Sequence, residues 1–430
     1  MASPGPKRVP IPKNGVDYRG KVVLAPMVRS GELPSRLLAL KYGADLVWGP
    51  ETIDRAIIGT TRRLNPNTFT IEFSRLPTSK IQNPTLDPSN RESVIYRIHP
   101  ELEHKRLIYQ IGTANPGLAV QAAKIVAADV AGIDVNAGCP KPFSTAGGMG
   151  AALLKTPDLL CSILRKLVEE IGKEYEIGIS VKIRLLEKSE DTEALVRKLV
   201  ATGITGLTVH CRTTPMRPRE RVIRQQLRMV GDVCREAGVA CIMNGDVTSR
   251  TEALQLIKEY NVDAAMIATE AEKNPSCFRP DAEGGPDEWK SMWKTVVTEY
   301  MRLALQVENR WGNTKYLLNQ MIPGKETYHA AMTRCKCYAD VIKALDLQDV
   351  EGMMDQARVV DERLGIPPKE SRASKRARVN EAKAEVPAKK EKHKSQPNEQ
   401  HSVKRVKLPE PSTDAPIILQ DVPATAALSV

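Results

Sequence analysis

The sequence predicts an α/β protein: a closed (β/α)₈ barrel of the TIM type, followed by a small helical domain and a disordered basic tail. Three observations support this prediction. Eight short apolar runs recur between residues 21 and 270, and helical patterns lie between most of them. After Phe278 the strand pattern stops, and amphipathic helical patterns replace it. Beyond Pro367 the chain consists largely of Lys, Glu, Ser, Pro and Ala, a composition that cannot bury a core.

The eight runs are each four to seven largely apolar residues that turn polar or Gly-rich at their carboxyl ends. Runs of this kind are typical of strands buried on both faces of a parallel sheet. They lie at residues 21–27, 44–50, 106–112, 132–138, 179–185, 206–212, 240–246 and 264–270.

Helical patterns follow five of the runs, at residues 33–42, 116–128, 157–172, 192–201 and 251–260. This alternation predicts βα units, and eight units in about 260 residues is the size of a closed barrel. The alternative is an open doubly wound sheet, which would need a GxGxxG turn after an early strand; the sequence has none. Residues 51–105 exceed what one helix requires, so they predict an insertion that shapes the active-site face.

The predicted domains follow from these changes in pattern. Further helical patterns at residues 287–306, 313–320, 325–337 and 349–364 indicate a helical domain. We therefore expect an N-terminal extension at 1–20, a catalytic barrel at 21–280, a helical domain at 281–366 and a disordered tail at 367–430.

The net charge of +11 is concentrated near the C-terminus, because residues 369–407 contain 13 Lys or Arg and five Asp or Glu. A basic segment favours anionic partners such as nucleic acid. On composition alone, a solvated tail without a partner is the alternative. The clusters at 375–378 and 404–407 are also typical of localisation signals, which favours a cytoplasmic or nuclear location, or both.

The cysteines bear on compartment and metal content. Eight are present, and none forms a CxxC pair or a disulfide framework, which predicts a reducing intracellular compartment. Cys335 and Cys337 form a lone CxC without further ligands, so no metal site is predicted. No apolar run is long enough to cross a bilayer, so no membrane span is predicted either. The sequence does not fix the oligomeric state; a monomer is favoured.

Polar and reactive residues stand at the carboxyl ends of the predicted strands, where a barrel of this kind carries its active site. Taken singly, each has a plain structural explanation, such as a strand-end Lys or a small buried Cys. Their joint placement favours a functional site. The set comprises Pro26, Met27, Gln110, Asn136, Cys139, Lys182, His210, Asn244, Gly245, Asp246, Ala268 and Thr269.

The stretch at 134–154, DVNAGCPKPFSTAGGMGAALL, resembles the signature of the tRNA-dihydrouridine synthases. LAPM at 24–27, YQIG at 109–112, VKIR at 181–184, VHCRT at 209–213 and IMNGD at 242–246 are similar to motifs of that family, in the same order. The resemblance covers residues 21–280, and the helical segment after it fits the family's C-terminal helical domain. Residues 26–45 and 148–154 are most similar to eukaryotic members that act on position 20 of tRNA.

This resemblance implies reduction of a uridine in tRNA, at position 20 in the D-loop, to 5,6-dihydrouridine. The implied cofactor is flavin mononucleotide (FMN), and NADPH or NADH is the reductant. Hydride would pass from flavin N5 to uracil C6, and Cys139 would donate the proton to C5. A thiol suits this role, since its unperturbed pKa of about 8.5 leaves it protonated at neutral pH. Asn136, Lys141 and Arg212 are the implied substrate contacts.

The resemblance also implies the flavin contacts. Lys182 and His210 resemble family residues beside the flavin, where a cation near N1 and C2 stabilises the reduced ring. Gln110 would bond the pyrimidine edge of the ring, against which Pro26, Met27 and Val28 would lie. The implied phosphate site consists of Asn244, Gly245, Asp246, Ala268 and Thr269.

Two departures from the family pattern qualify these expectations. Family members often carry Gly or Ala followed by Arg where this chain has Ala268 and Thr269, so backbone contacts or another cation must replace that arginine. Some animal relatives append a double-stranded-RNA-binding domain, whereas this chain has no Phe, Trp or Tyr from Ala339 onward.

Two other functions stay open on the sequence. One is a flavin-barrel reductase of a free pyrimidine, which needs no surface for a polyanion. The other is a non-catalytic RNA-binding barrel protein, which would not require Cys139, Lys182 and His210.

Overall fold

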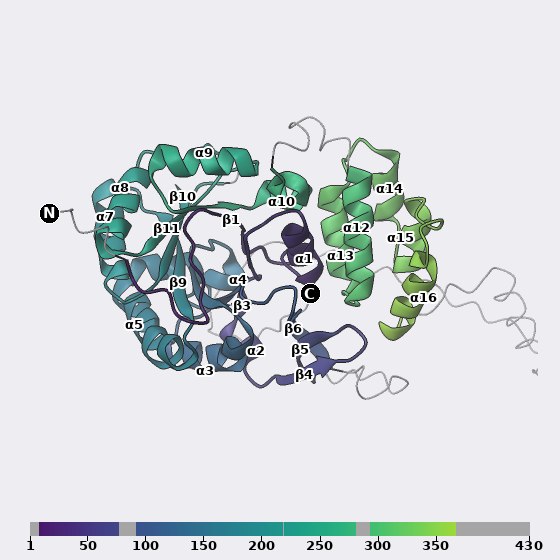
Figure 1. Cartoon of the computed structure of the whole chain (residues 1–430), viewed down its shortest axis with the longest axis horizontal. Helices are drawn as coiled ribbons and strands as arrows, with labels where there is room; N and C mark the ends of the chain where they lie inside the picture. The colour runs from purple at the N-terminus through teal and green to yellow at the C-terminus, as the bar shows by residue number, and fades with distance from the viewer. Residues whose placement is uncertain (1–7, 77–91, 218, 281–292, 367–430) are drawn as a thin grey trace, which may run out of the picture. The chain divides into compact units, whose positions relative to one another are not determined.

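Eight parallel strands close into a barrel with helices around it, as predicted (Figure 1). The computed structural model describes residues 8–76, 92–217, 219–280 and 293–366, so the predicted tail at 367–430 lies outside the described residues. The strands are β1 (Lys21–Leu24), β2 (Leu46–Trp48), β7 (Leu107–Gly112), β8 (Gly132–Ala137), β9 (Gly178–Leu185), β10 (Gly206–Thr213), β11 (Ala240–Asn244) and β12 (Ala264–Ile267). Each coincides with one predicted run.

Strand β2 closes the barrel between β1 and β7. It pairs with β1 through Leu46 and Val47, and with β7 through Val47 and Trp48. It therefore has two register pairs on either side, whereas β8 and β9 share six. The short strand β3 (Thr52–Ile53) pairs in parallel with the carboxyl end of β7.

Helices cover the outside of the barrel. The helices that follow barrel strands are α1 (Leu33–Lys41), α3 (Pro116–Val126), α5 (Pro157–Leu167), α7 (Ser189–Val200), α8 (Leu227–Ala237), α9 (Arg250–Tyr260) and α10 (Thr269–Lys273). Shorter segments are α2 (Asp54–Ile57), η2 (Ala127–Asp129), α4 (Pro142–Thr145), η3 (Gly150–Lys155), η4 (Val168–Gly172), α6 (Lys173–Tyr175) and η5 (Pro275–Phe278).

The insertion predicted after the second strand contains an antiparallel sheet that the sequence analysis did not foresee. Its strands are β4 (Thr61–Asn65), β5 (Thr70–Arg75) and β6 (Ser93–Ile98). Arg36 of α1 forms a fully buried ion pair with Glu103, at 2.6 Å, and also donates to the carbonyl of Arg97 in β6. This buried cation ties the insertion to the barrel wall.

Helices alone follow the barrel in the part of the chain that is described. They are α12 (Trp293–Gln306), α13 (Trp311–Met321), α14 (Thr327–Thr333), α15 (Tyr338–Ala344) and α16 (Met353–Arg363). Helix α12 packs on α1, and α13 packs on α10. Four of the five match predicted segments; α15, of seven residues, was not predicted. No helix among the described residues is long and apolar enough to cross a membrane.

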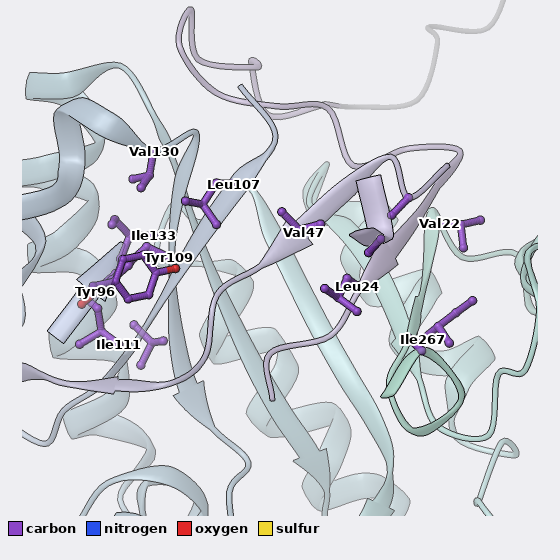
Figure 2. Close-up of a cluster of buried hydrophobic side chains, with 14 of the residues drawn as sticks. Val22, Leu24, Val47, Tyr96, Leu107, Tyr109, Ile111, Val130, Ile133 and Ile267 are labelled. Carbon is purple, nitrogen blue, oxygen red and sulfur yellow. The ribbon is translucent and has the colours of Figure 1, made fainter. Parts of the chain in front are cut away.

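Two layers of apolar side chains fill the barrel domain, because alternate residues of a strand face opposite sides. The outer layer lies between strands and helices, and Figure 2 shows part of it, including Val22 and Leu24 of β1 and Val47 of β2. The interior of the barrel, here called the bore, is filled by a second cluster: Tyr18, Val23, Ala25, Leu46, Trp48, Ile108, Ala131, Ala240, Ile242, Ala264 and Met266. Tyr18 belongs to the segment predicted as an extension, yet its side chain is 1% exposed.

Candidate active site

The predicted site residues of five strands stand together at the carboxyl end of the barrel. Asn136 of β8 is the register partner of Lys182 of β9, and His210 of β10 is the partner of Asn244 of β11. Gln110 of β7 lies one strand further along, beside Asp134. Strand alternation directs these side chains into the bore. The sequence-predicted residues of these strands are therefore brought to one place.

A chain of hydrogen bonds runs from the middle of the bore to the loop that carries Cys139. The Gln110 amide nitrogen donates to Asp134 at 2.8 Å, and the Asn136 amide nitrogen donates to the Gln110 carbonyl oxygen at 3.2 Å. The Asn136 side-chain oxygen then accepts from the backbone N–H groups of Gly138 and Cys139, both at 3.0 Å. The amide groups of Gln110 and Asn136 are thus used to position the loop.

Asp134 anchors this chain and was not singled out from the sequence. It is fully buried and also accepts a hydrogen bond from Ser180 at 2.7 Å. Burial raises its pKa to about 6, although the bonds from Gln110 and Ser180 lower it. A signal existed in the sequence, because Asp134 precedes Asn136 by two residues and must share its face of the strand.

Cys139 is half-buried in the turn after β8. Its carbonyl accepts from Ala151 at 2.9 Å, and the Arg184 guanidinium donates to the carbonyl of Gly138 at 3.0 Å. Burial raises the pKa of the Cys139 thiol, the backbone N–H of Lys141 lowers it, and the Glu51 carboxyl raises it. The thiol is therefore held in its protonated form at neutral pH, as a proton donor requires.

Lys182 and His210 carry opposite protonation states. Burial and the neighbouring Arg184 lower the pKa of Lys182 to about 8, so it remains a cation at neutral pH. Burial and the cations Lys182, Arg184 and Arg212 lower the pKa of His210 to about 2, so the imidazole is neutral. Its Nε2 lies 3.3 Å from an Arg212 nitrogen, which can only donate. Nε2 is therefore the acceptor, and Nδ1 carries the proton.

The turn after β11 holds the predicted phosphate-site residues. The Asn244 side chain donates to the carbonyl of Met266 at 3.0 Å, and Gly245 adopts a φ of +126°, which favours glycine. Both carboxylate oxygens of Asp246 accept from Arg212, at 2.7 and 2.8 Å. The predicted substrate contact Arg212 is thus paired with Asp246, and its side chain is 5% exposed.

Arg224 is a further cation at this turn, and the sequence analysis missed it. Its guanidinium donates to the carbonyl of Asp246 at 2.9 Å. Its Nε is buried and has no hydrogen-bond partner among the described residues. Arg224 lies in an irregular loop between β10 and α8, where periodicity gives no signal.

The other predicted residues border the same end of the barrel. Pro26 and Met27 are half-buried after β1, and Val28 is 46% exposed. Ala268 is half-buried and Thr269, the first residue of α10, is exposed. Lys141 is exposed just before α4. No group of three or more His, Cys, Asp or Glu side chains that could hold a metal ion occurs among the described residues.

The model of the dihydrouridine synthase family matches residues 23–363. The chain belongs to the dihydrouridine synthase family. The family match begins inside β1 and includes the rest of the barrel and the five described helices after it, together with every predicted site residue.

Two yeast members of the dihydrouridine synthase family are similar over most of this chain. The tRNA-dihydrouridine(20) synthase [NAD(P)+] of Schizosaccharomyces pombe is 49% identical, with 77% of this chain and 66% of that protein covered. The enzyme of the same name from Saccharomyces cerevisiae is 45% identical, with 76% and 83% covered. The chain thus spans about two thirds of the fission yeast relative. The S. cerevisiae tRNA-dihydrouridine(20a/20b) synthase [NAD(P)+] is 26% identical, with 60% and 62% covered.

The residues at the barrel mouth fit a bound flavin. Lys182 places a half-buried cation in the bore, where an anionic ring edge can use it. The buried Nε of Arg224, beside the turn at Gly245, is a donor at the predicted phosphate site that has no partner within the described part of the chain.

Proposed function

We propose that this protein reduces uridine in tRNA to 5,6-dihydrouridine, with FMN as cofactor and NADPH, or NADH, as reductant. One observation carries the proposal: a protonated, half-buried thiol, Cys139, stands at a barrel mouth that also presents a cation, Lys182, and a neutral imidazole, His210. The family membership and the names of the yeast relatives support the same reaction.

The residues of this chain divide the work of such a reaction. When bound, the reduced flavin would supply the hydride that C6 of the uracil receives. Cys139 then gives its thiol proton to C5, which completes the saturation of the C5–C6 bond. Asn136 holds the Cys139 backbone at the required place through its two backbone hydrogen bonds.

The flavin site uses Lys182 and Arg224 as its cations. Lys182 would supply a cation to the ring, and His210 would donate to it from Nδ1 because Arg212 occupies its Nε2. Arg224 takes the place of the arginine that this chain lacks at Thr269, next to the Asn244–Asp246 turn. Pro26, Met27 and Val28 would hold the ring, and Lys141 would contact the tRNA.

We place the reaction at position 20 of the D-loop. The relatives named for position 20 are 45 to 49% identical, whereas the relative named for positions 20a and 20b is 26% identical. The helical domain at 281–366 provides a second contact surface for the tRNA. The tail at 367–430 acts as a localisation signal to the nucleus, and a supplementary tRNA contact is the alternative.

Dihydrouridine mapping tests the reaction and its position together. Unmodified tRNA is incubated with the full chain, FMN and NADPH, and dihydrouridine is located by sequencing of the borohydride-treated product. We expect one new dihydrouridine, at position 20, that is absent with Cys139→Ala. Product at another position would refute the assignment to position 20. Turnover of free uracil or uridine, with tRNA untouched, would favour the free-pyrimidine reductase.

Truncation after Pro368 tests the tail. If the tail is a localisation signal, the truncated chain keeps its affinity for tRNA and loses its nuclear pool. A weaker affinity with a smaller salt dependence would instead identify the tail as a tRNA contact.

A further inference from the structure

The environment of the Cys139 thiol contains two cations that work against its proposed role. Lys182 and Arg184, both on β9, lie beside the Cys139 turn: Lys182 is the register partner of Asn136, and Arg184 donates to the carbonyl of Gly138. Each cation would stabilise a thiolate there. A thiolate is a nucleophile and has no proton to donate. A proton donor at this position therefore needs a group that opposes the two cations.

Glu51 is such a group, and it comes from a different part of the barrel. It stands between β2 and β3 and is half-buried. Its Oε1 accepts a hydrogen bond at 2.9 Å from Ser144, a fully buried residue of α4. The same helix lies directly after the Cys139 turn. The hydroxyl of Ser144 thus fixes the carboxyl beside the turn.

The second oxygen of Glu51 is buried and unsatisfied. Oε2 has no hydrogen-bond partner among the described residues. Burial raises the pKa of Glu51, while the neighbouring side chains of Ser144, Cys139 and Asn136 favour its charged form and lower it. The Cys139 thiol is thus an electrostatic neighbour of this carboxyl, which raises the pKa of the thiol in turn.

Close packing fixes this arrangement. A Cβ atom on Gly112 would come within 2.5 Å of Glu51 Oε1. A Cβ atom on Gly150, which has a φ of +57°, would lie 2.4 Å from Ser144 Oγ and 2.6 Å from the carbonyl oxygen of Cys139. Position 150 therefore requires glycine, and a side chain at position 112 would displace the Glu51 carboxyl. The absence of side chains at both positions leaves room for the carboxyl, the Ser144 hydroxyl and the Cys139 backbone.

We propose that Glu51 is a positioning residue for Cys139: its carboxylate offsets Lys182 and Arg184 and keeps the thiol protonated until it donates to the substrate. Ser144 holds the carboxylate, and the Lys141 backbone N–H is the remaining polar group at the sulfur. This role rests on the proposed function, in which Cys139 is the acid. The effect on the thiol itself exists without tRNA.

The test measures the pH at which Cys139 becomes reactive. The full chain is treated with iodoacetamide between pH 6 and 10, and alkylation of the Cys139 peptide is followed by mass spectrometry. Cys337, the other half-buried cysteine, is the internal reference. In Glu51→Gln, which preserves shape and can still accept from Ser144, the midpoint for Cys139 should fall by about one pH unit. The alkaline limit of single-turnover tRNA reduction should fall with it.

Matched variants separate this role from a general loss of structure. Asp54→Asn removes another buried carboxylate of the same segment, one that bonds Thr113 instead, and should leave the Cys139 midpoint unchanged. Glu51→Asp should recover part of the shift.

An unchanged or raised midpoint in Glu51→Gln would overturn the proposal, as would an equal fall in Asp54→Asn. These outcomes are independent of the proposed reaction. If wild-type protein alkylates as expected but reduces no tRNA, the proposed function fails while the pairing of Glu51 with Cys139 stands.

Discussion

The two halves of the bore differ in chemistry. Apart from Asn244 at the carboxyl end of β11, strands β11, β12, β1 and β2 fill their half with apolar side chains, among them Ile242, Met266, Val23 and Trp48. Strands β7 to β10 instead direct polar side chains inward. In chain order these are Gln110, Asp134, Asn136, Ser180, Lys182, Thr208 and His210. The first half excludes water and holds the barrel together. The second half positions the candidate functional side chains, and the burial of these polar groups lowers the stability of the fold.

That cost is visible in individual groups of the polar half. The pKa values of Lys182 and His210 are both lowered, chiefly by burial, which means that the fold disfavours their charged forms. The hydroxyl of Thr208 is buried without a hydrogen-bond partner among the described residues. The comparison indicates that different strands of one barrel provide the functional side chains and the stabilising core. Substitutions in the polar half should therefore change activity or binding, and substitutions in the apolar half should change the unfolding free energy.

The largest effect should come from Cys139→Ala. Loss of a general acid should lower the single-turnover rate of tRNA reduction by about 10²- to 10⁴-fold. The unfolding free energy should change little, since the side chain is half-buried. Rapid mixing of the reduced protein with tRNA measures the rate, and Cys337→Ala serves as the control. A normal rate in Cys139→Ala would remove the thiol from the chemistry.

Trp48→Ala should show the opposite pattern. The indole is completely buried in the apolar half and packs on Tyr18, with ring centroids 5.8 Å apart. Its removal should lower the unfolding free energy by about 3–5 kcal/mol, through lost burial and a residual cavity. Urea unfolding followed by circular dichroism measures this loss. A variant as stable as the wild type would contradict the stabilising role of this half.

Lys182→Met tests whether the polar half binds flavin at the expense of the unfolding free energy. The methionine keeps most of the volume and removes a charge that the fold disfavours, so the unfolding free energy should stay equal or rise. Flavin affinity, measured by quenching of flavin fluorescence, should fall about tenfold because the cation beside the ring is lost. A destabilised variant that keeps its flavin affinity would show that Lys182 stabilises the fold and does not bind the flavin.

The smallest effect concerns pH. Lys182, with a pKa near 8 in the free protein, is a cation below that value and neutral above it. Bound anionic flavin favours the cation, so affinity should be full at pH 7 and decline several-fold as the pH rises beyond about 8. Fluorescence titrations at a series of pH values test this, and the decline should be absent in Lys182→Met.

The sequence predicted the barrel well because strands buried on both faces leave a strong signal. All eight apolar runs became strands, and the long gap after the second run contains an insertion. The antiparallel sheet inside that insertion was not predicted, since its strand β4 is exposed and polar. Tyr18 was missed as a bore residue because a single aromatic in a Pro-rich segment has no periodic context.

Site residues could be predicted only where a polar residue ends a recognisable apolar run of the sequence. Asn136, Lys182 and His210 were found because each stands at the end of its own apolar run. Glu51 and Ser144 were not, since their importance lies in a contact between residues 93 positions apart. Arg212 stays a predicted substrate contact, and its pairing with Asp246 is a feature that no spacing in the sequence reveals.

The short closing strand β2 has a consequence for slow motions. Its two register pairs on either side offer the fewest backbone bonds of any barrel strand, so its amides should exchange with deuterated solvent sooner than those of β8 and β9. Glu51 follows this strand by three residues, so local opening there would uncouple the carboxylate from Cys139 while the rest of the barrel stays folded. Deuterium uptake at Val47 and Trp48 would therefore report how often the Glu51 carboxylate moves away from Cys139.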